Sequence, residues 1–112
     1  MALIKNVEDI EAVPYGNGAL KRKVFAREDG APTFAMRVFD VEPGGASSHH
    51  SHDFEHEVLI LQGYGILKTE QGDTPFTEGM AIMVPPDEVH QFQYTGMETL
   101  RFACMVPLRG EE

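Results

Sequence analysis

The sequence of 112 residues predicts an all-β sandwich or barrel that forms a single domain, residues 1–112. Short apolar runs recur roughly every ten residues, which is the spacing of strands joined by tight turns. The 11 glycines and 7 prolines are scattered between these runs, as a fold with many turns requires. A chain of this length buries roughly two-thirds of the surface that its unfolded form exposes, which is enough for one hydrophobic core.

Seven segments are predicted to be strands, because each is a short apolar or alternating run that ends at turn-forming residues. In chain order they are residues 20–26, 34–41, 58–61, 66–70, 80–84, 89–94 and 99–106. The first is a weak candidate, and the second ends at Pro43 and two glycines. The third is apolar on both faces, as in a fully buried strand. Turns are predicted at residues 71–73 and 85–88.

One short helix is predicted at residues 7–13, with Asn6 as its N-cap. It has one to two turns at most, so it does not change the fold class. Residues 1–19 are predicted to form an N-terminal extension, and the barrel itself covers about residues 20–107.

The charge of the chain argues against several classes of partner. Its net charge is −9, so nucleic acids and anionic membrane surfaces would be repelled. No apolar run is long enough for a signal peptide or a membrane span. Cys104 is the one cysteine, which excludes an internal disulfide. We therefore expect a cytoplasmic protein.

Histidines are the strongest functional signal, since four of the five lie between positions 49 and 56. His50 and His52 alternate along an extended chain, so both side chains project to one face and can reach one ion. His49 projects to the opposite face, as a solvent-exposed histidine would. His56 follows after a turn, and His90 comes from a distant segment, which a barrel can bring into the same lumen. The sequence therefore predicts a metal site at His50, His52, His56 and His90.

The glycines and prolines around these histidines resemble the two motifs of the cupins. The first cupin motif is Gly, five residues, His-x-His, three or four residues, Glu, six residues, Gly. This chain has Gly44, five residues, His50-Ser51-His52, three residues, His56, six residues and Gly63. The second motif is Gly, five residues, Pro-x-Gly, two residues, His, three residues, Asn. This chain has Gly79, five residues, Pro85-Pro86-Asp87, two residues, His90, three residues and Tyr94.

The motifs and their flanking strands cover roughly residues 34–106. The resemblance implies an RmlC-like jelly-roll barrel of the small, single-domain cupin type, with its metal bound through four histidines. It also implies a homodimer, paired through sheet faces or exchanged N-terminal strands. Asp87 replaces the turn glycine of the second motif, and aspartate tolerates such turns better than most residues. Tyr94 replaces the asparagine, which is often a structural position in the family.

The departure with chemical consequences is His56, because the family usually has a glutamate ligand at this position. Glu57 is the alternative ligand, with four residues between it and His52. It leaves only five residues before Gly63, one fewer than the motif requires, so the spacing favours His56.

Four imidazole ligands would leave the full charge on a divalent ion and two open coordination positions on an octahedral one. This arrangement favours a dioxygenase-like, metal-dependent oxidoreductase that acts on a small organic molecule. Two alternatives are an isomerase or lyase without redox chemistry and a non-catalytic binding or sensing protein. Manganese or iron is expected in vivo, whereas nickel, zinc, copper or cobalt could bind during purification.

Apolar strand residues are candidates for a substrate pocket, although side chains of this kind more often fill the core. The candidates are Phe34, Met36, Phe92, Phe102 and Cys104, with Met105 beside them. Cys104 alternates with Phe102 and Val106, so it lies either near the metal or in an inert buried position.

A different metal site is suggested by the spacing of His52, Glu55 and His56, which fits a His-x-x-Glu-His zinc peptidase pattern. That pattern needs a helix, which the neighbouring glycines and the apolar strand oppose.

Overall fold

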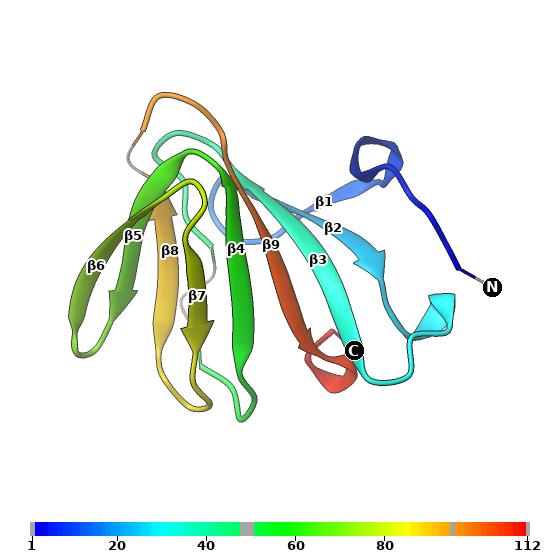
Figure 1. Ribbon diagram of the computed structural model, residues 1–112. Helices are drawn as coiled ribbons and strands as arrows, with labels where there is room; N and C mark the ends of the chain where they lie inside the picture. The colour runs from blue at the N-terminus through cyan, green and yellow to red at the C-terminus, as the bar shows by residue number, and fades with distance from the viewer. Residues whose placement is uncertain (1, 48–50, 95, 112) are drawn as a thin grey trace.

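The computed structural model describes residues 2–47, 51–94 and 96–111, and it confirms the predicted all-β jelly-roll barrel (Figure 1). The strands are β1 (Ala12–Pro14), β2 (Ala19–Phe25), β3 (Phe34–Val41), β4 (His56–Gln62), β5 (Tyr64–Thr69), β6 (Gly72–Thr77), β7 (Ala81–Val84), β8 (His90–Tyr94) and β9 (Leu100–Pro107). In these same ranges, three short 3₁₀ turns accompany the strands: η1 (Val7–Asp9), η2 (Arg27–Asp29) and η3 (Leu108–Gly110). Within the described ranges, no helix is long and apolar enough to cross a membrane.

Two antiparallel sheets enclose the core. One has the order β1-β2-β3-β9-β4-β7 and the other the order β6-β5-β8. Burial alternates along β9, so Leu100, Phe102, Cys104 and Val106 face the interior. Because alternate side chains of a strand share a face, the residues between them lie on the outer surface of the larger sheet.

The short helix predicted at residues 7–13 is wrong in most of its length. Asn6 does cap a turn, since its side chain accepts a hydrogen bond of 2.9 Å from the backbone N–H of Glu8. Only Val7–Asp9 are helical, however, and none of them is buried. Without an apolar face to bury, the segment pairs instead with the edge of β2 as strand β1.

Strand β6 was not predicted, because Gly72, Asp73 and Pro75 are typical of turns and loops. It lies at the edge of the smaller sheet and, among the residues that the structure describes, pairs only with β5. An edge position tolerates proline, since the missing N–H leaves no partner strand unsatisfied.

Asp87 provides the first testable prediction. Its φ of 68° lies in the left-handed region, which agrees with its place at the motif's turn glycine. Its backbone N–H donates to the carbonyl of His52 at 2.6 Å, so the turn also holds the segment that carries His52. We expect Asp87→Ala to destabilise the protein by about 1 kcal/mol and Asp87→Gly to be nearly neutral, as measured by urea unfolding. Equal effects of the two substitutions would contradict this explanation.

Candidate metal centre

Three histidines from different parts of the chain meet inside the barrel. His56 is the first residue of β4, His90 is the first residue of β8 in the other sheet, and His52 lies just before β4. One ring nitrogen from each lies within 4.8 Å of the others. Nε2 of His56 is 3.1 Å from Nδ1 and 3.0 Å from Nε2 of His52. The three imidazoles therefore converge on a single point.

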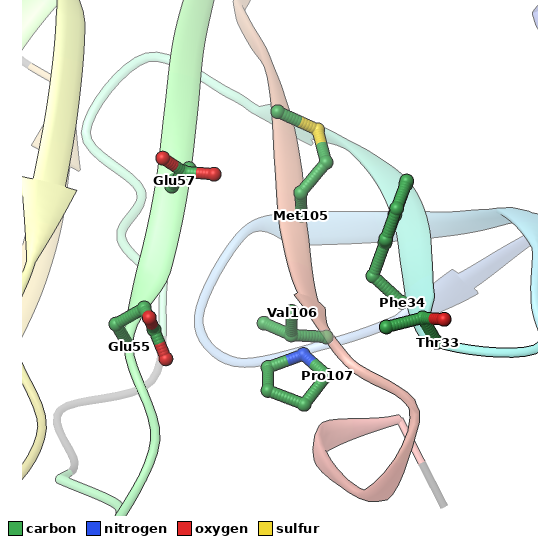
Figure 2. Close-up of a pocket in the computed structure, with 7 residues that line it drawn as sticks. All are labelled: Thr33, Phe34, Glu55, Glu57, Met105, Val106 and Pro107. Carbon is green, nitrogen blue, oxygen red and sulfur yellow. The ribbon is translucent and has the colours of Figure 1, made fainter.

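The position of His56 follows from strand alternation. In β4 the inward residues are His56, Val58 and Ile60, and Glu57 lies on the exposed face between them. The structure thus brings His56 together with His52 and His90, and it places Glu57 outside the barrel. Figure 2 shows Glu57 beside an outer groove that Glu55 also lines.

Not every predicted ligand falls within the described residues. His50, and with it His49, lies outside them, so three of the four predicted ligands are seen together. The helix required by the zinc peptidase pattern is absent from residues 51–62, because the segment before β4 is irregular and β4 begins at His56.

Outer contacts select the ring nitrogen that faces the site in two of the histidines. Nδ1 of His90 lies 2.9 Å from the carbonyl oxygen of Glu88, which can only accept a hydrogen bond, so this nitrogen carries the proton. Nδ1 of His56 lies 3.1 Å from Sγ of Cys104. Contacts of this kind fix the orientation of metal-binding imidazoles and direct Nε2 to the ion.

Burial favours the state of His52 that binds metals. His56 and His90 are only 5% and 2% exposed. Burial, followed by the positive field of a protonated His90, lowers the pKa of His52 below its ordinary value of 6.5. The neutral imidazole is therefore favoured near neutral pH, and only the neutral form donates a lone pair to a metal. Three imidazole nitrogens converging at one largely buried point fit a divalent transition metal.

The predicted substrate residues divide into two groups. Phe92, Phe102 and Cys104 face the interior and border a cavity of about 20 Å³ beside His56 and His90, which has room for about one water molecule. Phe34 is 61% exposed and lines the outer groove (Figure 2), and the half-buried Met36 shares its face of β3. The structure thus separates these two residues from the histidines.

Two further residues at the site were not predicted. Arg37 is only 3% exposed and faces inward with Ala35 and Phe39. Its Nη1 lies 2.9 Å from Oε1 of Glu111, and its Nη2 lies 3.2 Å from Sγ of Cys104. The sequence does contain one signal for Arg37, which is a charged residue on the apolar face of a strand.

Charge pairing accounts for the burial of Arg37. Burial alone would raise the pKa of Glu111, but hydrogen bonds from Lys21 and Arg37 outweigh it and hold that pKa below the ordinary value of 4.5. Glu111 is thus a carboxylate at neutral pH. Burial raises the pKa of Cys104, so its sulfur is a protonated thiol there.

A jelly-roll barrel with inward histidines contributed by both sheets defines a class of small proteins suited to binding a metal. The chain belongs to the cupin family, whose Cupin domain profile matches residues 37–106.

Similar proteins include several that are named as enzymes. The chain is 34% identical over 74 residues to the 1-methylthio-D-xylulose 5-phosphate methylsulfurylase of Rhodospirillum rubrum; this covers 66% of the chain but only 47% of that relative. Among solved structures, the polyketide cyclase RemF from Streptomyces resistomycificus is 31% identical, with a TM-score of 0.88 over 96% of this chain and 80% of that one. A cupin-2 domain from Rhodospirillum rubrum is 24% identical, with a TM-score of 0.81 over 96% of this chain and 75% of that one, which shows the shared fold.

Proposed function

We propose that this cupin is a metal-dependent enzyme that acts on a small organic molecule, with a divalent ion held by His50, His52, His56 and His90. The observation that carries the proposal is the convergence of three imidazoles within 4.8 Å, two of them buried and that of His52 half-buried. His50 is included because it precedes His52 at the spacing of the first motif. When bound, the ion would supply a Lewis acid that neutral ligands leave at its full charge.

The protein's own residues would hold and shield this site. The carbonyl of Glu88 keeps the proton of His90 on Nδ1, on the outer side of the ring. Phe92 and Phe102 leave room for little water beside the histidines, which strengthens electrostatic interactions there.

Dioxygenase-like oxidation is the first candidate reaction, with iron or manganese as the expected ion. It is supported by the neutral ligand set, since four imidazoles would leave open positions for an organic ligand and O₂. The test measures oxygen consumption by Fe(II)- or Mn(II)-loaded protein with panels of small diketones, aromatic compounds and thiols. Absence of metal-dependent uptake with every panel would remove this candidate.

A reaction without redox chemistry is the second candidate, and the similarity to a polyketide cyclase favours it. Ring closure needs no oxidant, so turnover should be unchanged under strict anaerobiosis. The same loaded protein and the same panels, extended to linear polyketide mimics, distinguish the two reactions. A ligand that binds tightly but is not turned over with any metal would indicate a sensing or binding protein instead.

We also propose that the protein is a homodimer paired through the outer face of the larger sheet. Three methionines share a cross-strand row with Glu57 on this face, because the register pairs Glu57 with Met83 and Met105, and Met105 with Met36. Leu59 and Met83 are 42% and 64% exposed. Contiguous apolar surface of this kind is typical of protein interfaces. A second copy of the chain would cover it.

Light scattering of a double variant tests the dimer. We expect Leu59→Lys with Met83→Lys to convert the dimer to a monomer, because two ammonium groups would have to be desolvated in the interface. Met97→Lys is the matched control, since Met97 is 91% exposed and does not belong to the sheet. A wild-type monomer, or a double variant that stays dimeric, would refute this interface.

A further inference from the structure

The η3 turn, followed by Glu111, reaches the histidine cluster along two separate lines of contact. The first line is a buried series of polar side chains that ends at His56. The second is a stack of rings that ends at His52. Both begin within the four residues 108–111.

The polar line runs through three adjacent strands. Glu111 Oε1 lies 2.9 Å from Arg37 Nη1, Arg37 Nη2 lies 3.2 Å from Cys104 Sγ, and Cys104 Sγ lies 3.1 Å from His56 Nδ1. Arg37 and Cys104 are direct partners in the β3–β9 register, so their side chains share the inner face. Both residues are at most 3% exposed. Glu111 is therefore connected to His56 through packed groups.

The direction of the hydrogen bonds indicates what the polar side chains do for His56. A guanidinium can only donate, so the sulfur of Cys104 accepts from Arg37. Once an ion occupies Nε2 of His56, Nδ1 carries the proton and donates to the same sulfur. Cys104 is thus placed as the acceptor that orients the His56 ring, and Arg37 holds that acceptor in position.

The ring line reaches His52 through Phe54. Phe54 stacks on His52 with ring centroids 4.3 Å apart and planes 9° apart. The guanidinium of Arg109 lies 5.3 Å from the centre of the Phe54 ring and forms an ion pair of 2.5 Å with Asp53. Gly110 packs so closely that a Cβ there would lie 2.7 Å from Phe54. The turn therefore fixes Phe54 from two directions.

We propose that the η3 turn with Glu111 is a clamp on the metal site, which sets the ring positions of His52 and His56 through these two lines. Cys104, Arg37 and Phe54 act as positioning residues in this clamp and do not touch the ion. The inference rests on the proposed metal binding but on no particular reaction.

The test for the polar line uses two substitutions of Cys104 that separate hydrogen bonding from packing. Cys104→Ser keeps an acceptor, whereas Cys104→Val keeps an apolar side chain of similar size. Co(II) affinity is measured by competition with a chromophoric chelator, and the ligand-field absorption reports the geometry of the bound ion. We expect Val to weaken Co(II) binding about 10- to 100-fold and to shift the absorption bands, and Ser to stay within a few-fold of wild type.

Two more variants extend the test to the turn itself. Glu111→Gln removes the charge that anchors Arg37, and Phe54→Leu removes the stack on His52; each should weaken Co(II) binding about tenfold with altered bands. Asp73→Asn is the control, because the Lys68–Asp73 ion pair is exposed and Asp73 lies on β6, at the edge of the smaller sheet. Circular dichroism confirms that each variant is folded.

The possible outcomes separate the clamp from the metal site. Wild-type affinity and unchanged bands in both Cys104→Val and Phe54→Leu would overturn the clamp while leaving the metal site intact. Weaker binding in Cys104→Ser than in Cys104→Val would show a packing role and would also overturn it. A wild-type protein that binds no Co(II) would overturn the metal site and the clamp together.

Discussion

Replacing His56 or His90 by alanine is expected to abolish nearly all stabilisation of the protein by added metal. A ligand that binds only the native state at 100 times its Kd stabilises it by about 2.7 kcal/mol, which corresponds to a rise of roughly 10 °C in Tm for a domain of this size. Each alanine variant removes one of the three convergent nitrogens. Wild type should show this rise with added Co(II) or Mn(II) and lose it with a chelator, and the variants should show a rise of no more than roughly 2 °C.

Glu57→Ala is the control that shows whether metal binding depends on His56 or on Glu57. Glu57 is the alternative ligand suggested by the sequence, and it adjoins His56 in β4 but lies on the exposed face. We expect the Glu57 variant to bind metal with wild-type stoichiometry, as measured by elemental analysis. Loss of metal in Glu57→Ala together with retention in His56→Ala would show that the bound state uses the other residue.

The choice between His56 and Glu57 illustrates what the sequence can predict. Hydrophobic alternation usually reveals which residues of a strand face inward, but residues 58–61 are apolar on both faces. The reason is now visible: Leu59 and Leu61 lie on the outer surface and are each 42% exposed. Motif spacing favoured His56 where periodicity could not decide, because spacing reflects the fixed reach of the chain between turns.

The fold was predictable because its strands are bounded by strong turn formers, whereas the surroundings of the site were not. Arg37 stands out in the sequence only as a charge on an apolar face. Its partner Glu111 is 74 positions away. Such a pairing is set by the order of strands in the sheet, which local patterns do not encode. The same reason applies to β1, since its strand conformation depends on the exposed edge of β2.

Phe102→Ala is expected to cost about 3–5 kcal/mol of unfolding free energy, because this side chain is core and not a dispensable part of a substrate wall. Phe102 is 2% exposed and packs between Phe39 and Phe92, with ring centroids 5.2 and 4.9 Å away. The neighbouring cavity of about 20 Å³ shows how little free space adjoins it. Removing the ring would leave a void that rigid strands on both sides cannot close. Urea unfolding of the metal-free protein measures this cost without a contribution from the ion.

Phe34→Ala is the matched substitution on the other side of the same barrel wall. Phe34 was a candidate for the same pocket, but it is 61% exposed on the outer face of β3. We expect it to change the unfolding free energy by less than about 1 kcal/mol, as substitutions at exposed positions generally do. A small effect at Phe102 would mean that the lumen tolerates a void, which is the property of a ligand cavity. The ratio of the two changes in unfolding free energy therefore distinguishes a packed barrel from a hollow one. In a packed barrel the chemistry is confined to the histidine cluster, whereas a hollow barrel admits substrate.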